Sequence, residues 1–221
     1  KLQAGDTQGA FAIWNRELRL RRYLGKLVEI EALSRVGGIA YTKNNRQQIK
    51  YITQRLQVIQ KQAQSTQTKD LQVLLALGEA YRQVRTPSLA VEVYNQVLTV
   101  VRDSSDIARE IDTLKTIGKV HLDWFDYPAA ATTYEQLLSL VSNNNDIAES
   151  LKDLAYIYDL TKQHRKAIDA RTKLSLVYRQ RNDINQLAAL KLAIGSNYEA
   201  LAKENPNEVD EAFTNYQEAY T

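Results

Sequence analysis

The feature that most constrains the fold is a pair of residues that returns about every 40 residues along the chain. The pair is usually an alanine followed four positions later by an aromatic residue. Its members are Ala10 and Trp14, Ile49 and Thr53, Ala90 and Tyr94, Ala130 and Tyr134, Ala167 and Arg171, and Ala212 and Tyr216. Residues four positions apart lie on one face of an α-helix. The recurrence therefore predicts one helix repeated along a stacked array, and not a single irregular core.

A second column of small residues precedes the first by a few turns of helix. It contains Gly37, Gly78, Gly118, Ala155 and Gly195. In the clearest unit, residues 71–98, an apolar face with helical period ends before Thr86-Pro87. We expect Thr86 to be the N-cap of the next helix, with Pro87 in its first turn. Each unit is therefore predicted to be a helix–turn–helix pair in which the small residues allow close packing.

The periodicity predicts an all-α chain that forms one domain over residues 1–221. Expected helices span 6–23, 26–43, 45–64, 69–84, 87–102, 106–124, 127–142, 146–161, 163–180, 183–203 and 208–220. They group into a half unit at 1–23 and repeat units at 26–64, 69–102, 106–142, 146–180 and 183–220. This is a leading helix plus about five helix pairs. Because the chain starts at Lys1 and contains no methionine, we expect it to be excised from a longer polypeptide, with any membrane anchor upstream of residue 1.

Related connectors precede three of the first helices: SSDIARE at 104–110, NNDIAES at 144–150 and RNDINQL at 181–187. Each has an aspartate that is predicted to accept hydrogen bonds from the free N–H groups of the following helix. These residues are Asp106, Asp146 and Asp183. Asp146 and Glu149 also have the spacing of a capping box.

Composition and motifs argue against catalysis and against cofactor or metal binding. The chain has no cysteine and two histidines, and its acidic residues are spread over capping and surface positions. No zinc-protease, phosphate-loop or nucleophile-elbow motif is present. We predict no catalytic residue, no cofactor and no metal.

The net charge and the apolar runs bear on other kinds of partner. A net charge of +3 is too balanced to indicate that the chain binds nucleic acid. No run reaches the ~20 apolar residues of a membrane span, so we expect a soluble domain, cytoplasmic or peripheral to a membrane.

The columns resemble those of the tetratricopeptide repeat (TPR) family. The residues that carry the resemblance include Leu77-Gly78, Tyr81, Ala90, Tyr94, Ile117-Gly118, Tyr134, Leu154-Ala155, Tyr158, Gly195, Tyr198, Ala212 and Tyr216. The units are longer than the family's usual ~34 residues, and the 26–64 unit fits least well. The resemblance implies a right-handed superhelical solenoid whose concave groove is lined mainly by the first helix of each pair. It also implies a non-catalytic scaffold for protein–protein interaction.

The predicted partner-binding residues are those that lie off the packing stripe of each first helix. They are Glu79, Arg82, Lys115, Lys119, Asp123, Lys152, Tyr156, Asp159, Ser196 and Glu199. A mixed polar groove of this kind suits an extended or helical partner segment. The alternative is that these side chains are ordinary solvated surface. Chaperone-binding TPR domains use asparagines beside lysines to bind a terminal carboxylate. Glu79, Tyr156 and Ser196 occupy those asparagine positions here, which argues against that ligand.

A basic patch consists of Arg16, Arg19, Arg22 and Lys26. Arg16, Arg19 and Arg22 lie along one face of the first helix, opposite its apolar side, and Lys26 follows that helix. The patch could contact an acidic partner, a membrane complex or an anionic membrane surface, or it could be plain solvated surface. At the other end, Phe213, Tyr216 and Tyr220 lie on a last helix with no helix to cover it. Homo-oligomerisation through that end is an open alternative.

Residues 6–25, DTQGAFAIWNRELRLRRYLG, are similar to TPR proteins of oxygenic phototrophs that assist photosystem assembly and repair at the thylakoid membrane. The resemblance implies a scaffold for a membrane complex such as photosystem II. One alternative is a peptide- or ligand-sensing domain attached to an effector. A helical-repeat RNA-binding protein is a weaker alternative because Glu79, Asp123, Asp159 and Glu199 interrupt the basic groove that it would need.

Overall fold

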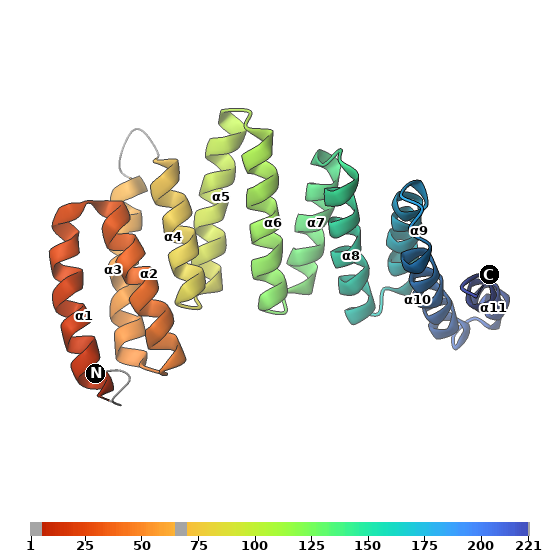
Figure 1. The fold of residues 1–221 in the computed structure, drawn as a ribbon, viewed down its shortest axis with the longest axis horizontal. Coiled ribbons are helices and arrows are strands. Elements are labelled where there is room, and N and C mark those ends of the chain that lie inside the picture. Colours follow the sequence, from red (N-terminus) through yellow and green to blue (C-terminus); the bar gives the residue numbers. More distant parts are fainter. Residues whose placement is uncertain (1–5, 65–69, 221) are drawn as a thin grey trace. The chain divides into compact units, whose positions relative to one another are not determined.

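The computed structural model describes residues 6–64 and 70–220, and all regular structure in those ranges is helical. The elements are α1 (Thr7–Arg21), the 3-10 turn η1 (Arg22–Leu24), α2 (Lys26–Thr42), α3 (Arg46–Gln64), α4 (Leu71–Gln83), α5 (Pro87–Asp103), α6 (Ile107–Asp123), α7 (Tyr127–Leu140), α8 (Asn144–Leu160), α9 (His164–Gln180), α10 (Ile184–Ala202), η2 (Pro206–Glu208) and α11 (Val209–Glu218). Figure 1 shows them in order. The all-α prediction is confirmed, and each helix lies close to its expected range.

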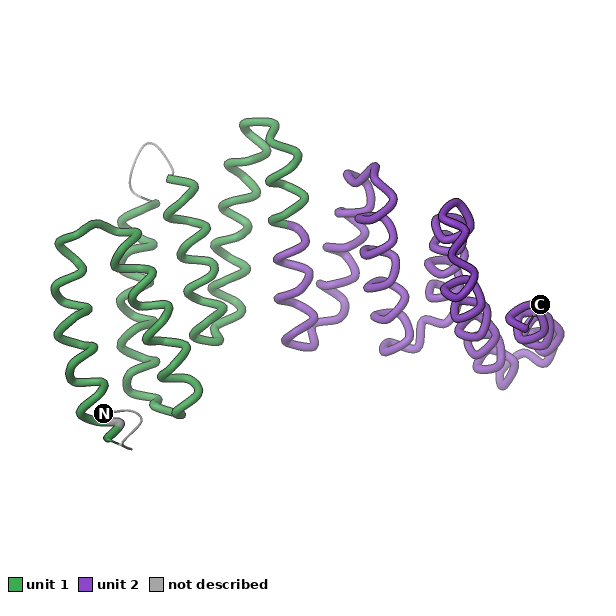
Figure 2. The backbone as a smooth tube through the Cα atoms, in the orientation of Figure 1, with its two compact units in different colours: residues 1–113 green, residues 114–221 purple. Residues whose placement is uncertain are grey.

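The chain divides into two compact units, residues 1–113 and 114–221, which Figure 2 colours separately. In the first unit, α2 packs on α3 and on α4, and α4 packs on α5. In the second unit, α8 packs on α7 and α9, and α10 packs on α9 and α11. Within each compact unit, neighbouring helix pairs therefore cover each other's apolar faces, which is how a repeat array builds its core.

Within three of the repeats, the glycine of the first helix contacts the tyrosine of the second helix. The ring of Tyr94 lies so close to Gly78 that a Cβ at Gly78 would be 2.7 Å from two ring carbons. The corresponding distances are 2.9 Å for Gly118 and Tyr134 and 2.8 Å for Gly195 and Tyr216. The small residue thus makes room for an aromatic ring from the second helix. In the 26–64 unit, where the aromatic position is Thr53, Gly37 instead receives the side chain of Val84.

Six of the described turns between helices each have one residue other than glycine in the left-handed region. These residues are Asn44, Arg85, Ser105, Phe125, Lys162 and Asn182, with φ between 52° and 61°. The amide that follows each of them donates to a carbonyl five residues back, as Gln163 N does to Tyr158 O at 2.8 Å. This is the hydrogen bond of a Schellman C-cap. It ends one helix and turns the chain directly into the next.

Two of the three predicted aspartate caps are confirmed. Asp106 accepts from the Arg109 amide at 3.1 Å, and Asp183 accepts from the Gln186 amide at 3.2 Å. The cap at Asp146 was wrong: α8 begins at Asn144, and the N-cap Asn143 accepts from the amides of residues 145 and 146. Asn143 offers an equivalent acceptor one turn earlier, so Asp146 lies inside the helix. There it accepts a hydrogen bond from Lys115 Nζ at 2.5 Å.

Thr86 is the N-cap of α5 by position, but its side chain does not cap the helix. Its hydroxyl donates to the carbonyl of Tyr81 at 3.1 Å instead.

Within residues 6–64 and 70–220, none of the helices is both long enough and apolar enough to cross a membrane.

Candidate partner-binding site

The 146–180 repeat departs from the glycine–tyrosine pattern at both positions. Ala155 stands where three other units have a glycine that faces a tyrosine ring, and Arg171 stands where they have the tyrosine. Ala155 is buried, and the Arg171 side chain keeps only 12% of its surface exposed. The guanidinium extends away to polar partners, so the space that a ring fills elsewhere stays open here.

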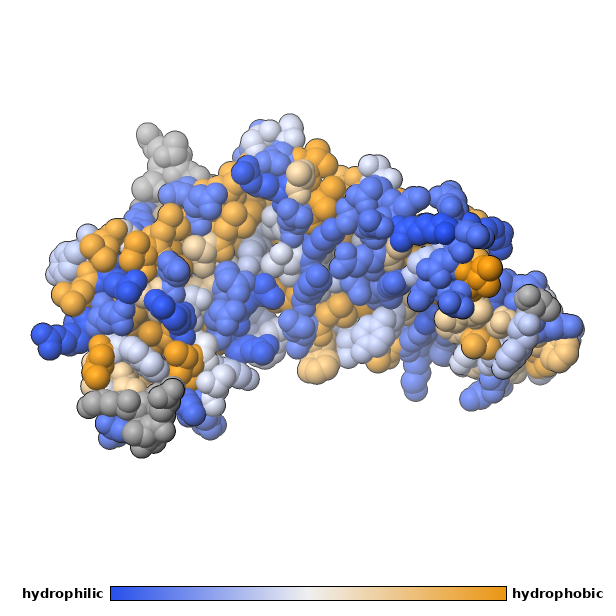
Figure 3. Space-filling view, in the orientation of Figure 1, coloured by the Kyte–Doolittle hydropathy of each residue, from blue (hydrophilic) through white to orange (hydrophobic). Residues whose placement is uncertain are grey.

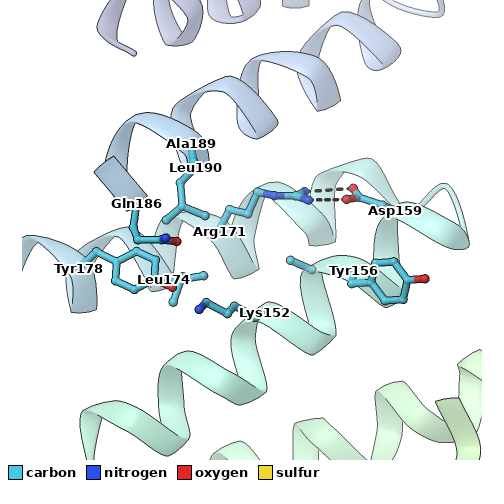
Figure 4. Close-up of a pocket in the computed structure, with 10 residues that line it drawn as sticks. Lys152, Tyr156, Asp159, Arg171, Leu174, Tyr178, Gln186, Ala189 and Leu190 are labelled. Atoms are coloured by element: carbon cyan, nitrogen blue, oxygen red, sulfur yellow. Dashed lines mark hydrogen bonds and ion pairs between the residues drawn. The ribbon is translucent and has the colours of Figure 1, made fainter. Parts of the chain in front are cut away.

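A cavity of about 220 Å³ lies at this place, between α8, α9 and α10 (Figure 4). Four of the ten lining residues are apolar and six carry polar groups, but most of the surface that faces the cavity is apolar. The lining residues are Lys152, Ala155, Tyr156, Asp159, Arg171, Leu174, Tyr178, Gln186, Ala189 and Leu190. All of them belong to the second compact unit. The arrangement is a mostly apolar pocket with convergent polar groups, which is the usual form of a binding site.

Arg171 is held by a hydrogen-bonded network that joins three helices. Its Nη1 donates to Asp159 Oδ1 at 3.0 Å and to Asn197 Oδ1 at 2.6 Å, and its Nη2 donates to Asp159 Oδ2. The amide nitrogen of Asn197, which is buried, donates to Asp159 Oδ1 at 2.9 Å and lies 3.2 Å from Nδ1 of His164. His164 is therefore part of this network. Because Arg171 is already paired, it forms a rigid wall of the cavity and is not a free cation.

The network also changes the acidity of Asp159. Desolvation by itself would raise the pKa of this carboxyl, but hydrogen bonds from Arg171 and Asn197 outweigh it and lower the pKa below the ordinary value. Asp159 is therefore ionised at neutral pH and keeps Arg171 in place.

Lys152 and Tyr178 supply the free polar groups of the cavity. Lys152 Nζ lies 5.4 Å from the centre of the Tyr178 ring, which is a cation–π distance. Figure 4 shows the Lys152 side chain extending toward Tyr178. The Tyr178 hydroxyl is buried and has no hydrogen-bond partner in the described part of the chain. A buried hydroxyl without a partner is costly, so this atom is a candidate to bond a ligand group.

The structure brings together three of the predicted partner-binding residues. Lys152, Tyr156 and Asp159 all line the cavity, and all come from α8. The Tyr156 ring points away from the cavity in Figure 4 and is 56% exposed. The remaining predicted residues lie outside it.

Several of those residues form pairs on the surface of the second unit. Lys115 Nζ lies 2.5 Å from Asp146, and Lys119 Nζ lies 3.6 Å from Glu149. Glu199 accepts a hydrogen bond from the Tyr216 hydroxyl at 2.8 Å. Asp123 and Ser196 are exposed. In the first unit, Glu79 and Arg82 pair with each other at 2.8 Å.

The sequence analysis missed Arg171 and Tyr178, because it looked for partner contacts on first helices alone, and it also missed Gln186. Arg171 and Tyr178 are on α9, the second helix of its pair, and Gln186 begins the next pair. The sequence did contain a sign of this site. The repeat at 146–180 is the one in which the position that is usually aromatic holds a charged residue, Arg171, opposite the small residue Ala155.

In the basic patch, Arg16, Arg19 and Lys26 are exposed. Arg22 differs, since its Nε lies 3.1 Å from the buried carboxylate of Glu29 and its Nη2 donates to the Tyr51 hydroxyl at 3.0 Å. Arg55 Nε donates to the same Glu29 oxygen, Oε1, at 2.6 Å, and Arg55 Nη2 donates to Glu29 Oε2 at 2.9 Å. The described residues contain no cluster of histidine, aspartate and glutamate side chains that could hold a metal ion.

Residues 73–108 match the family model described as tetratricopeptide repeat. No curated protein sequence shows significant similarity to the chain. Solved structures with a similar fold include BtubC from P. vanneervenii, which is 12% identical, with 95% of this chain and 89% of that chain covered and a TM-score of 0.52.

Two further structures have similar values. A putative kinesin light chain of nearly identical TPR-like repeats from Podosopora anserina is 15% identical, covers 89% of this chain and 96% of its own, and has a TM-score of 0.53. A signal-transduction ATPase from Pyrococcus horikoshii with a tetratricopeptide repeat sensor is 14% identical and covers 96% of this chain and 32% of its own, with a TM-score of 0.54. At these identities the likeness concerns the fold alone, which is that of a TPR-like repeat array.

Proposed function

We propose that this array of tetratricopeptide-like helix pairs is a non-catalytic scaffold that binds a segment of a partner protein. In this proposal the cavity between α8, α9 and α10 receives one side chain of that segment. TPR domains typically act as protein-interaction scaffolds, and the matched repeat at residues 73–108 supports that general role. The cavity beside Ala155 and Arg171 is the observation on which we base the location of the binding site.

The size and lining of the cavity favour a side chain over a free small molecule. Its volume of about 220 Å³ is below the ~300–1,000 Å³ of typical small-molecule sites. Leu174 and Leu190 offer apolar contact, while Lys152 and the Tyr178 hydroxyl offer hydrogen bonds. A buried anchor of this kind usually contributes most of the binding energy of an interface.

The second compact unit also carries charge pairs that suit the rest of such a segment. The pairs Lys115–Asp146 and Lys119–Glu149 place both signs of charge on α6 and α8 of the same unit. A polar, exposed rim around an apolar centre is the normal anatomy of a protein–protein interface. Charge pairs on the rim give specificity more than affinity.

The proposal is tested with peptides chosen by the protein itself. A random peptide library displayed on phage is selected on the wild type, and the peptides obtained are titrated by fluorescence anisotropy. Ala189→Trp, at an exposed position on the cavity wall, should fill the cavity and weaken binding at least tenfold. Lys152→Glu should do the same.

Lys173→Glu is the matched control, because Lys173 is exposed on α9 and lines a different cavity with Lys166 and Glu135. It should bind with wild-type affinity. Peptides that bind all three variants as well as the wild type would refute the assignment. Loss with Lys173→Glu alone would move the site to that second cavity.

For the partner, we propose a subunit of a photosystem complex. This rests on the resemblance of residues 6–25 to photosystem assembly and repair factors. The test is capture from detergent-solubilised thylakoid membranes with the wild type and with Lys152→Glu. Photosystem II subunits that are enriched by the wild type and lost with the variant would support the proposal. Equal recovery with both proteins would argue against it.

A further inference from the structure

The turn between α1 and α2 exposes four large apolar side chains within eight residues. Leu20 is 63% exposed, Tyr23 89%, Leu24 69% and Leu27 44%. We call these four residues the apolar tip. Figure 3 shows hydrophobic surface over this end of α1 and α2. Clusters of exposed apolar side chains usually mark an interaction site.

The backbone presents the tip at the end of two helices. The last turn of α1 tightens into η1, which has no buried residue, and Gly25 follows with φ of 118° before α2 begins. A Cβ at Gly25 would have no atom within 4 Å. Tyr23 and Leu24 therefore lie on a protruding turn that is open around Gly25.

Basic side chains surround the tip. Residues 16–28 contain five basic residues and one acidic residue, Glu17, for a net charge of +4 (five minus one). Glu17 is itself bound to Arg21 at 2.7 Å. Glu29, the next acidic residue, is buried between Arg22 and Arg55. Among the described residues, Arg16, Arg19 and Lys26 are exposed and have no ion-pair partner.

We propose that the α1–α2 turn docks on an anionic membrane surface, with the apolar tip in the headgroup–acyl boundary and the basic residues on lipid phosphates. Leucine favours the apolar side of that boundary, and tyrosine is enriched at the boundary itself. Each basic residue near an anionic surface adds about 1 kcal/mol, which corresponds to about fivefold in affinity. The combination of few apolar side chains with several cations predicts reversible, salt-sensitive binding.

The observations favour a lipid surface over a second protein. The tip consists of four side chains on a turn, whereas a stable protein interface buries ~800 Å² on each partner. Charge of one sign around the tip also disfavours a second copy of the chain, because the two basic rims would repel each other. A lipid surface matches both the small apolar area and the uniform charge.

The absence of cysteine allows a direct test. Leu24→Cys is labelled with an environment-sensitive fluorophore and mixed with vesicles of phosphatidylcholine, with or without 30% phosphatidylglycerol. The emission should shift to the blue with anionic vesicles and stay unchanged with neutral vesicles. Phe213→Cys, at a position that is 67% exposed on α11, is the matched control and should not shift.

Two further variants separate the apolar and basic contributions by co-sedimentation with the same anionic vesicles. Arg16→Gln with Arg19→Gln should weaken binding about 25-fold, which is about fivefold for each charge. Leu20→Ser with Leu24→Ser should weaken it by at least tenfold. All four positions are exposed, so the thermal unfolding curves should match that of the wild type.

Wild-type protein that stays in solution with anionic vesicles would overturn the proposal. Equal binding by all variants would also overturn it. A concentration-dependent dimer that the Leu20→Ser, Leu24→Ser variant no longer forms would show that the tip contacts a second copy instead.

Discussion

The ring of Tyr94 lies against the backbone of Gly78, at a distance that leaves no room for a methyl group. A Cβ at Gly78 would be 2.7 Å from two ring carbons, and real Cβ contacts are essentially never that short. The same relationship holds for Gly118 with Tyr134 and for Gly195 with Tyr216. One contact between a glycine and a ring thus organises several units of the array.

The first prediction concerns this contact. Gly78→Ala should destabilise the protein by ~1–3 kcal/mol, because the ring of the buried Tyr94 would have to move. The measurement is the midpoint of urea unfolding followed by circular dichroism.

Gly38→Ala is the control for the helix itself. Gly38 lies in α2, and the nearest atom to a Cβ there is Gln83 Oε1 at 3.4 Å, an ordinary contact. Alanine should therefore stabilise this helix by up to ~1 kcal/mol. Equal effects of both substitutions would show that the ring does not restrict position 78.

The second prediction concerns the last helix pair. Tyr216→Asp should loosen α10 and α11, because it removes the ring from Gly195 and places a carboxylate near Glu199. Hydrogen exchange measured by mass spectrometry should show faster exchange in residues 184–218, with less change in the first compact unit.

Phe213→Asp serves as the comparison on the same helix. Phe213 is 67% exposed, so its replacement should leave the exchange of α10 nearly unchanged. If Tyr216→Asp exchanged like the wild type, the packing of α11 described above would be wrong.

The third prediction concerns the turn between α8 and α9. Lys162 has φ of 57°, in the left-handed region that costs a residue with a Cβ ~1–2 kcal/mol. Lys162→Gly should relieve that strain and raise stability by ~0.5–1 kcal/mol after the entropy cost of glycine in the unfolded chain. Lys162→Val should lower the stability. A higher melting temperature with valine than with glycine would contradict this account of the turn.

The fourth prediction follows from the lowered pKa of Asp159. In the folded chain this pKa lies below its ordinary value of 3.8, because Arg171 and Asn197 donate to the carboxylate. The ionised group therefore stabilises the fold at pH values above the unfolded pKa. That stability is lost as the pH falls through the folded pKa.

Asp159→Asn should therefore be less stable than the wild type at pH 7, and the difference should shrink when urea unfolding is repeated below about pH 3.5. Asp169→Asn, at an exposed position on α9, is the control for general charge effects. A constant difference between wild type and Asp159→Asn across the whole pH range would refute the assigned cause of the shift.

The amino-acid sequence by itself determined the repeat, the approximate helix ranges and the columns of small and aromatic residues. Helical period and turn residues such as Thr86-Pro87 are local properties, so they can be read from neighbouring positions. The Asp106 and Asp183 caps were predictable for the same reason. The sequence also pointed to Lys152, Tyr156 and Asp159, which lie on one helix at helical spacing.

The positions at which a repeat departs from the common pattern could be understood only from the tertiary structure. It showed that Arg171 turns away to Asp159 and Asn197 and leaves a cavity, because these three residues are far apart in the chain and meet only when α8, α9 and α10 pack. It also showed that Leu20 and Leu24 are exposed although their neighbour Leu18 is buried. Helical spacing defines which residues share a face. Whether that face is covered depends on which other helix packs against it.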